Sequence, residues 1–226
     1  MYKLKNLLQN KSLLLFDFDG TIANTEWIQW MSFNEALKPF GVEISDKYFK
    51  TRLMSLHTEE ICLRLMKDYN IDFDIDTFYN KKRPLLLNLF KQENLQPFPY
   101  FNEILNEYKN NRRFAILSSG YTERINAMLD IWKLSNVFDT ILSVSDTKIS
   151  KKEFLSSTQK YLKESPQNIV YFEDANTNLA LGKEFGITTV GIEHDFNIGK
   201  IDKVNADFII DCKSYPKINK NHERII

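Results

Sequence analysis

The sequence predicts an α/β fold in which a doubly wound parallel sheet forms the core and an all-helical segment is inserted into it. Three observations carry this prediction. Short apolar runs that end in polar residues recur along the chain, helical patterns alternate with them, and one long stretch near the start holds helical patterns alone. Buried strands that alternate with helices are typical of a parallel sheet with both faces covered.

The predicted strands are short and apolar throughout, which indicates burial on both faces. Three of these strands each lead into a polar turn. Strand 13–16 is followed by Asp17-Phe18-Asp19-Gly20-Thr21, strand 114–117 by Ser118-Ser119-Gly120, and strand 169–172 by Glu173-Asp174. Three more are expected at 140–144, 188–192 and 207–210. The last two are rich in β-branched residues, which favour strands.

Helical patterns separate these strands. Apolar residues at helical spacing follow Pro99, a residue that suits the start of a helix, and they are Ile104, Leu105 and Tyr108. A second set comprises Ile125, Met128, Leu129 and Trp132. Because helices follow strands in this order, the connections predict crossovers between parallel strands.

Residues 24–96 interrupt this alternation. They contain helical stripes, such as Ile61, Cys62, Leu65, Met66 and Tyr69, and no convincing strand. The chain returns through Leu95-Gln96-Pro97-Phe98-Pro99, where two prolines restrict the backbone. We therefore expect a core domain of residues 1–23 and 97–226 and a helical cap domain of residues 24–96.

The composition is that of an ordinary globular protein. Of 226 residues, 43% are hydrophobic and 27% charged, and the 30 basic and 30 acidic residues cancel. Without a basic field, we expect no binding to nucleic acid or to a membrane surface. Cys62 and Cys212 form no disulfide framework, and we see neither a signal peptide nor a transmembrane run. A cytoplasmic location is expected.

The polar residues that follow the strands are the candidate site. Ligands of an open α/β sheet bind at the carboxyl ends of its strands, so these side chains can converge. They are Asp17, Asp19, Ser118, Ser119, Lys151, Glu173 and Asp174. Two carboxylates ~4 Å apart repel by about 4 kcal/mol at an effective dielectric near 20, so a cation is required or some must be protonated. An all-oxygen donor set favours a hard cation, and Mg2+ is the first choice.

Asp17 and Asp19 are two residues apart, so a continued strand conformation directs both side chains to one side. One carboxylate can attack phosphorus to give an aspartyl-phosphate. The other can protonate the leaving oxygen and later activate water. The pair thus suits a two-step hydrolysis.

These clusters resemble the motifs of the haloacid dehalogenase-like superfamily. Asp17-Phe18-Asp19-Gly20-Thr21 is similar to its first motif, Leu117-Ser118-Ser119-Gly120 to its second, Ser150-Lys151 to its third and residues 170–176 to its fourth. The order along the chain also agrees. The resemblance implies a Rossmann-like core, and the helical segment lies where the family often inserts a cap.

The resemblance also implies roles for the individual residues. Asp17 would be the nucleophile, Asp19 the acid/base and Lys151 a charge stabiliser; Ser118 and the backbone amides near Phe18 and Ser119 would bind phosphate; Asp17, Asp19, Glu173 and Asp174 would hold Mg2+. The branch with similar cap and core lengths includes phosphoglycolate phosphatases, sugar phosphatases and β-phosphoglucomutase. We therefore expect magnesium-dependent hydrolysis of a small phosphorylated metabolite by a monomer or weak homo-oligomer.

Several departures keep alternatives open. The third motif of that branch often continues Lys-Pro-x-Pro, whereas this chain has Ser150-Lys151-Lys152-Glu153-Phe154, so the active lysine is Lys148, Lys151 or Lys152. Gln29 stands where the mutase has a histidine, which weighs against a phosphosugar mutase without excluding it. The presence of Asp19 argues against dehalogenation.

Two further predictions concern an alternative function of the protein and the packing of its histidines and aromatic residues. A phospho-aspartate signalling protein also combines strand-end aspartates with a hydroxyl residue and a lysine, but the helical insertion argues against it. His57, His194 and His222 are scattered, and we expect them to be structural or exposed. The aromatic group Trp27, Trp30, Phe33 and Phe40 is expected to pack within the cap.

Overall fold

The core of the computed structural model is a parallel sheet, and the structure describes residues 2–54, 56 and 58–213. Its strands are β1 (Leu13–Phe16), β2 (Arg113–Ser118), β3 (Thr140–Ser143), β4 (Ile169–Glu173), β5 (Thr188–Glu193) and β6 (Phe208–Asp211). The order across the sheet is β3-β2-β1-β4-β5-β6, and every neighbouring pair is parallel. This confirms the predicted fold class and its strands. The order reverses at β1 and β4, which is where such sheets bind ligands.

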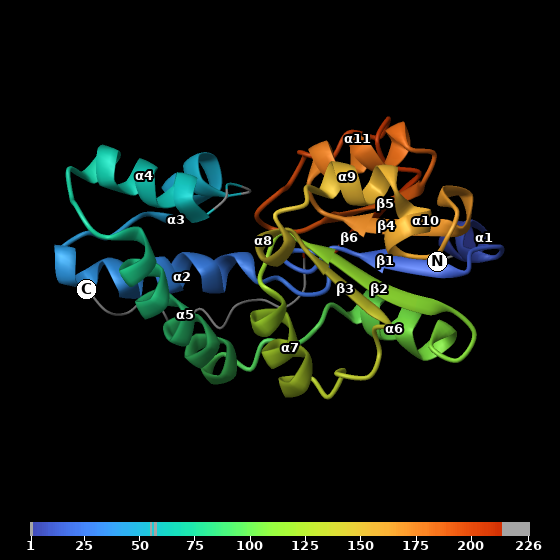
Figure 1. Cartoon of the computed structure of the whole chain (residues 1–226), viewed down its shortest axis with the longest axis horizontal. Helices are drawn as coiled ribbons and strands as arrows, with labels where there is room; N and C mark the ends of the chain where they lie inside the picture. Colours follow the sequence, from blue (N-terminus) through green and yellow to red (C-terminus); the bar gives the residue numbers. More distant parts are fainter. Residues whose placement is uncertain (1, 55, 57, 214–226) are drawn as a thin grey trace.

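Helices cover both faces of the sheet (Figure 1). On one side lie α6 (Pro99–Tyr108) and α7 (Thr122–Ile131), and on the other α9 (Lys151–Ser156), α10 (Thr158–Tyr161) and α11 (Asn176–Glu184). Shorter elements are α1 (Tyr2–Leu8), α8 (Val144–Thr147) and the 3-10 turn η3 (Pro166–Asn168). The helices at 99–108 and 122–131 are those predicted from the apolar spacing.

The apolar run of β1 is explained by burial on both faces. Leu14 and Phe16 belong to the larger hydrophobic cluster, whereas Leu13 and Leu15 belong to a separate cluster on the opposite face. Successive side chains of a strand point to opposite faces, so a strand between two helical layers needs an apolar residue at every position. Phe16 stacks on Phe172 of the neighbouring strand, with ring centroids 4.4 Å apart.

Between β1 and α6, the described residues form helices and no strand. The elements are α2 (Glu26–Leu37), the 3-10 turn η1 (Lys38–Phe40), α3 (Asp46–Tyr48), the π-helical turn η2 (Phe49–Leu53), α4 (Thr58–Tyr69) and α5 (Ile75–Gln92). We call residues 24–96 the helical segment; it lies to one side of the sheet in Figure 1. Within it, α2 packs against α5.

The aromatic group of the helical segment packs as expected. Trp27 and Phe33 are buried, and the ring of Phe40 packs at a tilt against the rings of Phe73 and Phe78. Trp30 donates a hydrogen bond from Nε1 to the carbonyl of Ile44 at 2.8 Å. All four residues therefore pack within the helical segment, with Trp27 and Phe33 in its interior and Phe40 at its surface.

The chain enters and leaves the helical segment at adjacent points. The amide of Phe98 donates to the carbonyl of Ile22 at 2.8 Å, and Trp132 Nε1 donates to the carbonyl of Leu95 at 2.7 Å. The two connections are therefore tied to each other and to α7. Among the described residues, no helix combines the length and the apolar character needed to cross a membrane.

The aromatic cluster at Phe16 generates a prediction about stability. Phe16 is fully buried and also packs edge-on against Phe101, with centroids 5.3 Å apart. Replacement of Phe16 by Ala leaves a cavity, so we expect a loss of about 3–5 kcal/mol in the free energy of unfolding, measured by urea denaturation. Leu63→Ala, at a side chain that is 52% exposed, is the control and should change it by less than about 0.5 kcal/mol. Equal effects would contradict this account of the core.

Candidate active site

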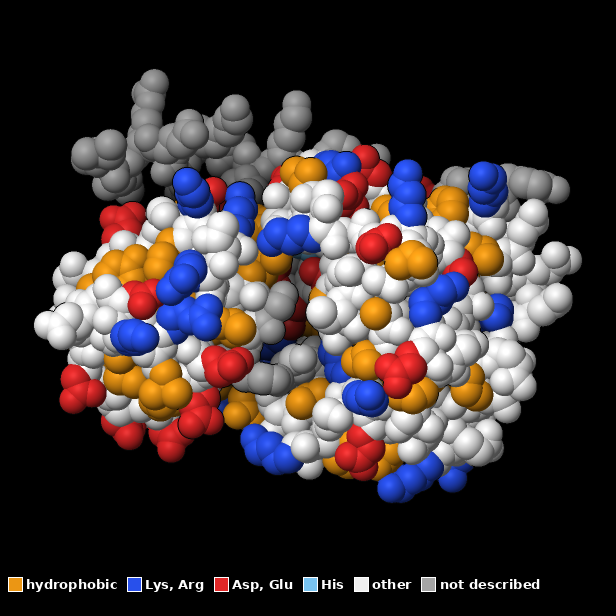
Figure 2. All heavy atoms as spheres, turned by 90° about the horizontal axis from the view of Figure 1, so that it is seen from above, with side chains coloured by type: hydrophobic (Ala, Val, Ile, Leu, Met, Phe, Trp, Pro, Cys, Tyr) orange, Lys and Arg blue, Asp and Glu red, His pale blue; other side chains and the backbone are white. Residues whose placement is uncertain are grey.

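A cavity of about 190 Å³ lies between the carboxyl ends of the strands and the helical segment. Figure 2 shows the molecule hollowed at this place, with acidic and basic side chains inside. Its wall on the sheet side includes Asp17, Ser118, Lys151 and Asp174, and its wall on the helical side includes Lys82. The switch point of the sheet therefore opens into a cavity that carries most of the predicted site residues.

Asp17 stands at the end of β1 and continues its hydrogen bonding. Its amide donates to the carbonyl of Phe172 at 2.9 Å, and only 5% of the residue is exposed. The carboxylate Oδ1 accepts a hydrogen bond from Lys151 Nζ at 2.7 Å. The neighbouring strand thus fixes the backbone while an ion pair fixes the side chain.

Lys151 is the lysine that the fold brings to the carboxylates. It is the first residue of α9, which Ser150 caps by accepting from the amide of Glu153 at 3.2 Å. Lys151 is buried and bridges Asp17 and Glu173, the latter at 2.8 Å. Burial lowers the pKa of Lys151, but the two carboxylates outweigh this effect and raise it above its usual value, so the ammonium stays charged.

The other two candidate lysines point elsewhere. Lys148 is exposed and ends α8 in the left-handed conformation, with φ of 61°. Lys152 is also exposed, and its Nζ lies 3.4 Å from Glu184. Successive residues of a helix point in different directions. Because Lys151 points into the protein, the next residue, Lys152, points into solvent.

Glu173, at the end of β4, is the most completely hydrogen-bonded carboxylate of the site. It accepts from the hydroxyl of Tyr171, from the amides of Asp174 (3.2 Å) and Ala175 (3.0 Å), and from Asn178 Nδ2 (3.2 Å). Burial raises its pKa, but the ion pair with Lys151 and these donors outweigh burial and leave the pKa lowered. Glu173 is therefore ionised and rigidly held.

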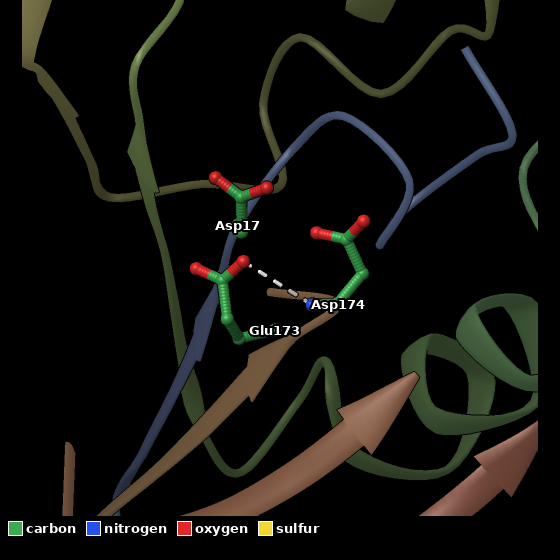
Figure 3. Close-up of side chains that lie close together, drawn as sticks. All are labelled: Asp17, Glu173 and Asp174. Carbon is green, nitrogen blue, oxygen red and sulfur yellow. Dashed lines mark hydrogen bonds between the residues drawn. The ribbon is translucent and has the colours of Figure 1, made fainter. Parts of the chain in front are cut away.

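Asp17, Glu173 and Asp174 form a cluster of oxygen ligands. One carboxylate oxygen from each lies within 4.8 Å of the others, and Figure 3 shows the three carboxylates gathered on one side of the adjacent ends of β1 and β4. Burial and the charge of Glu173 raise the pKa of both Asp17 and Asp174 well above their usual values. A buried set of this kind needs a cation or protons, and oxygen donors alone fit Mg2+.

Asp19 stands apart from this cluster. Its Oδ1 accepts from Thr25 Oγ1 at 2.7 Å and from Arg124 Nη1 at 2.8 Å, while its Oδ2 accepts from Arg124 Nη2. Burial raises the pKa of Asp19, but the guanidinium and the hydroxyl outweigh it and leave the pKa lowered. The structure therefore places the carboxylate of Asp19 on an arginine instead of with the three other carboxylates that the sequence grouped as metal ligands.

Arg124, which is only 9% exposed, was not among the residues predicted from the sequence. It precedes the apolar residue Ile125 in α7, and an arginine at such a position is expected to point into solvent. One signal was present, because the first turn of a helix that follows a strand-end motif faces the binding edge of the sheet. The two hydrogen bonds to Asp19 depend on a contact across 105 residues, which spacing does not reveal.

His194 was expected to be structural or exposed, and it is buried against Asp174. The amide of Phe196 donates to His194 Nδ1 at 3.3 Å, so the ring proton belongs on Nε2, which donates to Asp174 Oδ2 at 3.0 Å. Burial lowers the pKa of His194 to about 4, so the ring is neutral at pH 7. Of the other histidines, His57 and His222 lie outside the described residues.

Gly20 allows Asp174 and His194 to approach the first motif. A Cβ at this position would lie 2.5 Å from Asp174 Oδ2 and 2.8 Å from His194 Nε2. The φ of Gly20 is also positive, at 72°. The turn after β1 thus requires glycine for both space and backbone conformation.

The remaining predicted residues lie at the ends of β1 and β2. Ser118 is buried, and its Oγ accepts from the amide of Gly120 at 3.0 Å, while Ser119 is exposed and lines the cavity. The side chain of Phe18 is buried against Trp132, with ring centroids 5.8 Å apart. Phe18 can therefore contribute only its backbone to the cavity.

Known proteins resemble this chain in sequence and in structure. A probable pseudouridine-5'-phosphatase of Saccharomyces cerevisiae is 27% identical over 205 residues, which cover 80% of this chain and 81% of that protein. CbbY from Rhodobacter sphaeroides, solved in complex with phosphate, has a TM-score of 0.79 at 18% identity and covers 88% of this chain and 93% of its own.

A third relative was solved with a metal. It is the putative haloacid dehalogenase hydrolase YfnB of Bacillus subtilis, bound to magnesium, with a TM-score of 0.68 at 17% identity. The match covers 89% of this chain and 94% of that chain. These two solved structures show that the fold is shared.

The family follows from the sequence match. The model of a family described as haloacid dehalogenase-like hydrolase matches residues 14–192. This range contains the four motifs at 17–21, 117–120, 150–151 and 170–176. The match confirms the predicted resemblance and the predicted enzyme class. The chain belongs to the haloacid dehalogenase-like hydrolase family.

Proposed function

We propose that this protein is a magnesium-dependent phosphatase that hydrolyses a small phosphomonoester through an aspartyl-phosphate on Asp17. One observation carries the proposal. The fold places Asp17 beside Lys151, Glu173 and Asp174 at the switch point of the sheet, with a second carboxylate, Asp19, two residues further on. This arrangement holds a nucleophile, a fixed positive charge and a set of oxygen ligands in one cavity.

Each residue has a role in this proposal. Asp17 attacks phosphorus, Lys151 stabilises the charge that develops on the phosphoryl oxygens, and Ser118 with the amides near Phe18 and Ser119 binds those oxygens. Asp17, Glu173 and Asp174 would hold Mg2+. The bound ion would neutralise phosphate charge and allow the anionic substrate to approach Asp17.

Asp19 is the acid/base in this mechanism, and its partner Arg124 affects when it can act. The leaving oxygen needs a proton in the first step, and a water molecule must lose one in the second. The ion pair with Arg124 keeps Asp19 ionised, which suits the second step. For the first step, we propose that substrate entry separates the two side chains and that Asp19 then takes up a proton.

We further propose that residues 24–96 are a cap domain over a core of residues 1–23 and 97–226. The cavity lies between the two parts, and the connections are tied together at Ile22 and Phe98. A cap excludes water from the reacting groups and supplies contacts to the leaving group. The phosphatase named among the relatives supports a phosphorylated metabolite as substrate, and a sugar phosphate or a phosphoglycolate-like acid is the proposed class.

The nucleophile is tested by Asp17→Asn. We expect phosphate release from a panel of phosphorylated metabolites to require Mg2+, to stop with chelator, and to fall by at least about a thousandfold in the variant. The control is Asp211→Asn, at a carboxylate whose side chain is 65% exposed. Full activity of Asp17→Asn would contradict the proposal. If the protein instead formed an isomeric phosphosugar without free phosphate, it would be a mutase.

The metal site is tested through His194. Because His194 donates to Asp174, His194→Leu should leave that carboxylate free to rotate and weaken Mg2+ binding by about 10–100-fold. His194→Gln keeps an N–H donor and should lose less. Calorimetric titration of Mg2+ into each protein measures the affinity without turnover. An unchanged affinity in His194→Leu would show that His194 does not orient Asp174 for the metal.

A further inference from the structure

Lys82 is a buried lysine in the helical wall of the cavity. It belongs to α5, is only 3% exposed and lines the same cavity as Asp17. Its Nζ donates to Gln29 Oε1 at 2.7 Å and lies 4.1 Å from the centre of the Phe33 ring. Within the described part of the chain, no carboxylate forms an ion pair with it.

The other buried cations of the cavity are already neutralised. Lys151 bridges two carboxylates, and Arg124 binds both oxygens of Asp19. Lys82, in contrast, contacts the oxygen of a neutral amide and the face of an aromatic ring, neither of which carries a negative charge. An ammonium ion that is removed from water without an anion is costly, and an anion that enters the cavity would relieve that cost.

The pKa of Lys82 agrees with this environment. Burial lowers it to about 7, and the charge of Arg124 lowers it as well, while Asp19, Cys62 and Glu26 raise it. The cation is thus only partly populated at neutral pH in the absence of a ligand. A bound anion would restore the charged form.

We propose that Lys82 binds a second anionic group on the substrate, so that the enzyme selects phosphomonoesters whose leaving group carries a carboxylate or another phosphate. The inference rests on the proposed phosphatase function and narrows its substrate class. Gln29 assists by holding the ammonium at the cavity, and its amide nitrogen has no hydrogen bond within the described residues. The phosphoryl group that is transferred is served separately by Lys151 and the strand ends.

Matched substrates isolate the second anion. The acid 3-phosphoglycerate is compared with glycerol 3-phosphate, 6-phosphogluconate with sorbitol 6-phosphate, and fructose 1,6-bisphosphate with fructose 6-phosphate. The variant is Lys82→Met, which keeps the length of the side chain and removes the charge. The control is Lys81→Met, at an exposed lysine of the same helix.

In at least one pair, we expect the kcat/KM of the native protein to be tenfold or more higher for the substrate with the second anion. This difference should come mainly from a lower KM. In Lys82→Met this preference should fall at least tenfold, while kcat/KM for the neutral partner changes less than threefold. Lys81→Met should behave like the native protein. The melting temperature of Lys82→Met should not fall, because the substitution removes an unpaired buried charge.

The preference should also depend on pH. As the pH rises above about 7, Lys82 loses its proton and the ratio of the two kcat/KM values should decline. The pKa of Glu26 is raised to about 8, first by burial and then by Asp174 and Asp19, so its ionisation would repel anions in the same range. Lys82→Met retains Glu26. The difference between the two pH profiles therefore measures the contribution of Lys82, including its effect on the ionisation of Glu26.

Binding to the Asp17→Asn protein separates this inference from the proposed function. Calorimetry of the same pairs, with Lys82→Met added to Asp17→Asn, requires no turnover. A Lys82-dependent preference without phosphate release from the native protein would support the anion site and overturn the phosphatase. Phosphate release with equal loss on both members of each pair, or with no loss, would overturn the anion site and leave the phosphatase.

Discussion

Buried carboxylates meet at the ends of β1 and β4, and their negative charge governs how the other site residues are arranged. Parallel strands deliver their carboxyl ends to one edge, so residues 17, 173 and 174 meet although they are far apart in the chain. Three like charges in a buried site are unstable without compensation. Lys151 supplies part of it by bridging Asp17 and Glu173, and the raised pKa values of Asp17 and Asp174 indicate that more positive charge is needed.

The supporting residues divide the carboxylates by chemical state. Glu173 is held ionised by four donors and a lysine, and Asp19 by an arginine and a threonine, whereas Asp17 and Asp174 have fewer donors and raised pKa values. Environment thus gives similar side chains different tasks. Asp174 is further fixed by the neutral ring of His194, whose tautomer is set by a backbone amide.

The two walls of the cavity differ in how their cations are paired. On the sheet side, positive and negative groups bind one another before any ligand arrives. On the helical side, Lys82 depends on Gln29 and an aromatic ring. In the mechanism that we propose, the reacting groups therefore lie at the ends of the strands and the substrate selectivity lies in the helical segment. Gln29, which stands where the mutase has a histidine, accepts a hydrogen bond from Lys82.

The fold class, the strands and the set of polar residues at their ends could be predicted from the sequence. The local pattern suffices there, because a short apolar run such as 13–16 that ends in the polar turn Asp17-Phe18-Asp19-Gly20-Thr21 favours a buried strand followed by a loop. It also named Asp17, Ser118, Lys151, Glu173 and Asp174, all of which line one cavity.

The partners of these residues could not be predicted and follow from the packing of distant segments. Lys148, Lys151 and Lys152 are equivalent in a sequence, and the cap of α9 selects the one that faces Asp17. Arg124, His194 and Lys82 belong to no motif; Arg124 and Lys82 line the cavity, and His194 contacts Asp174 from behind it, all through contacts between distant segments. Charge pairing depends on distance in space and on burial, and spacing along a chain fixes neither of them once helices and strands have packed.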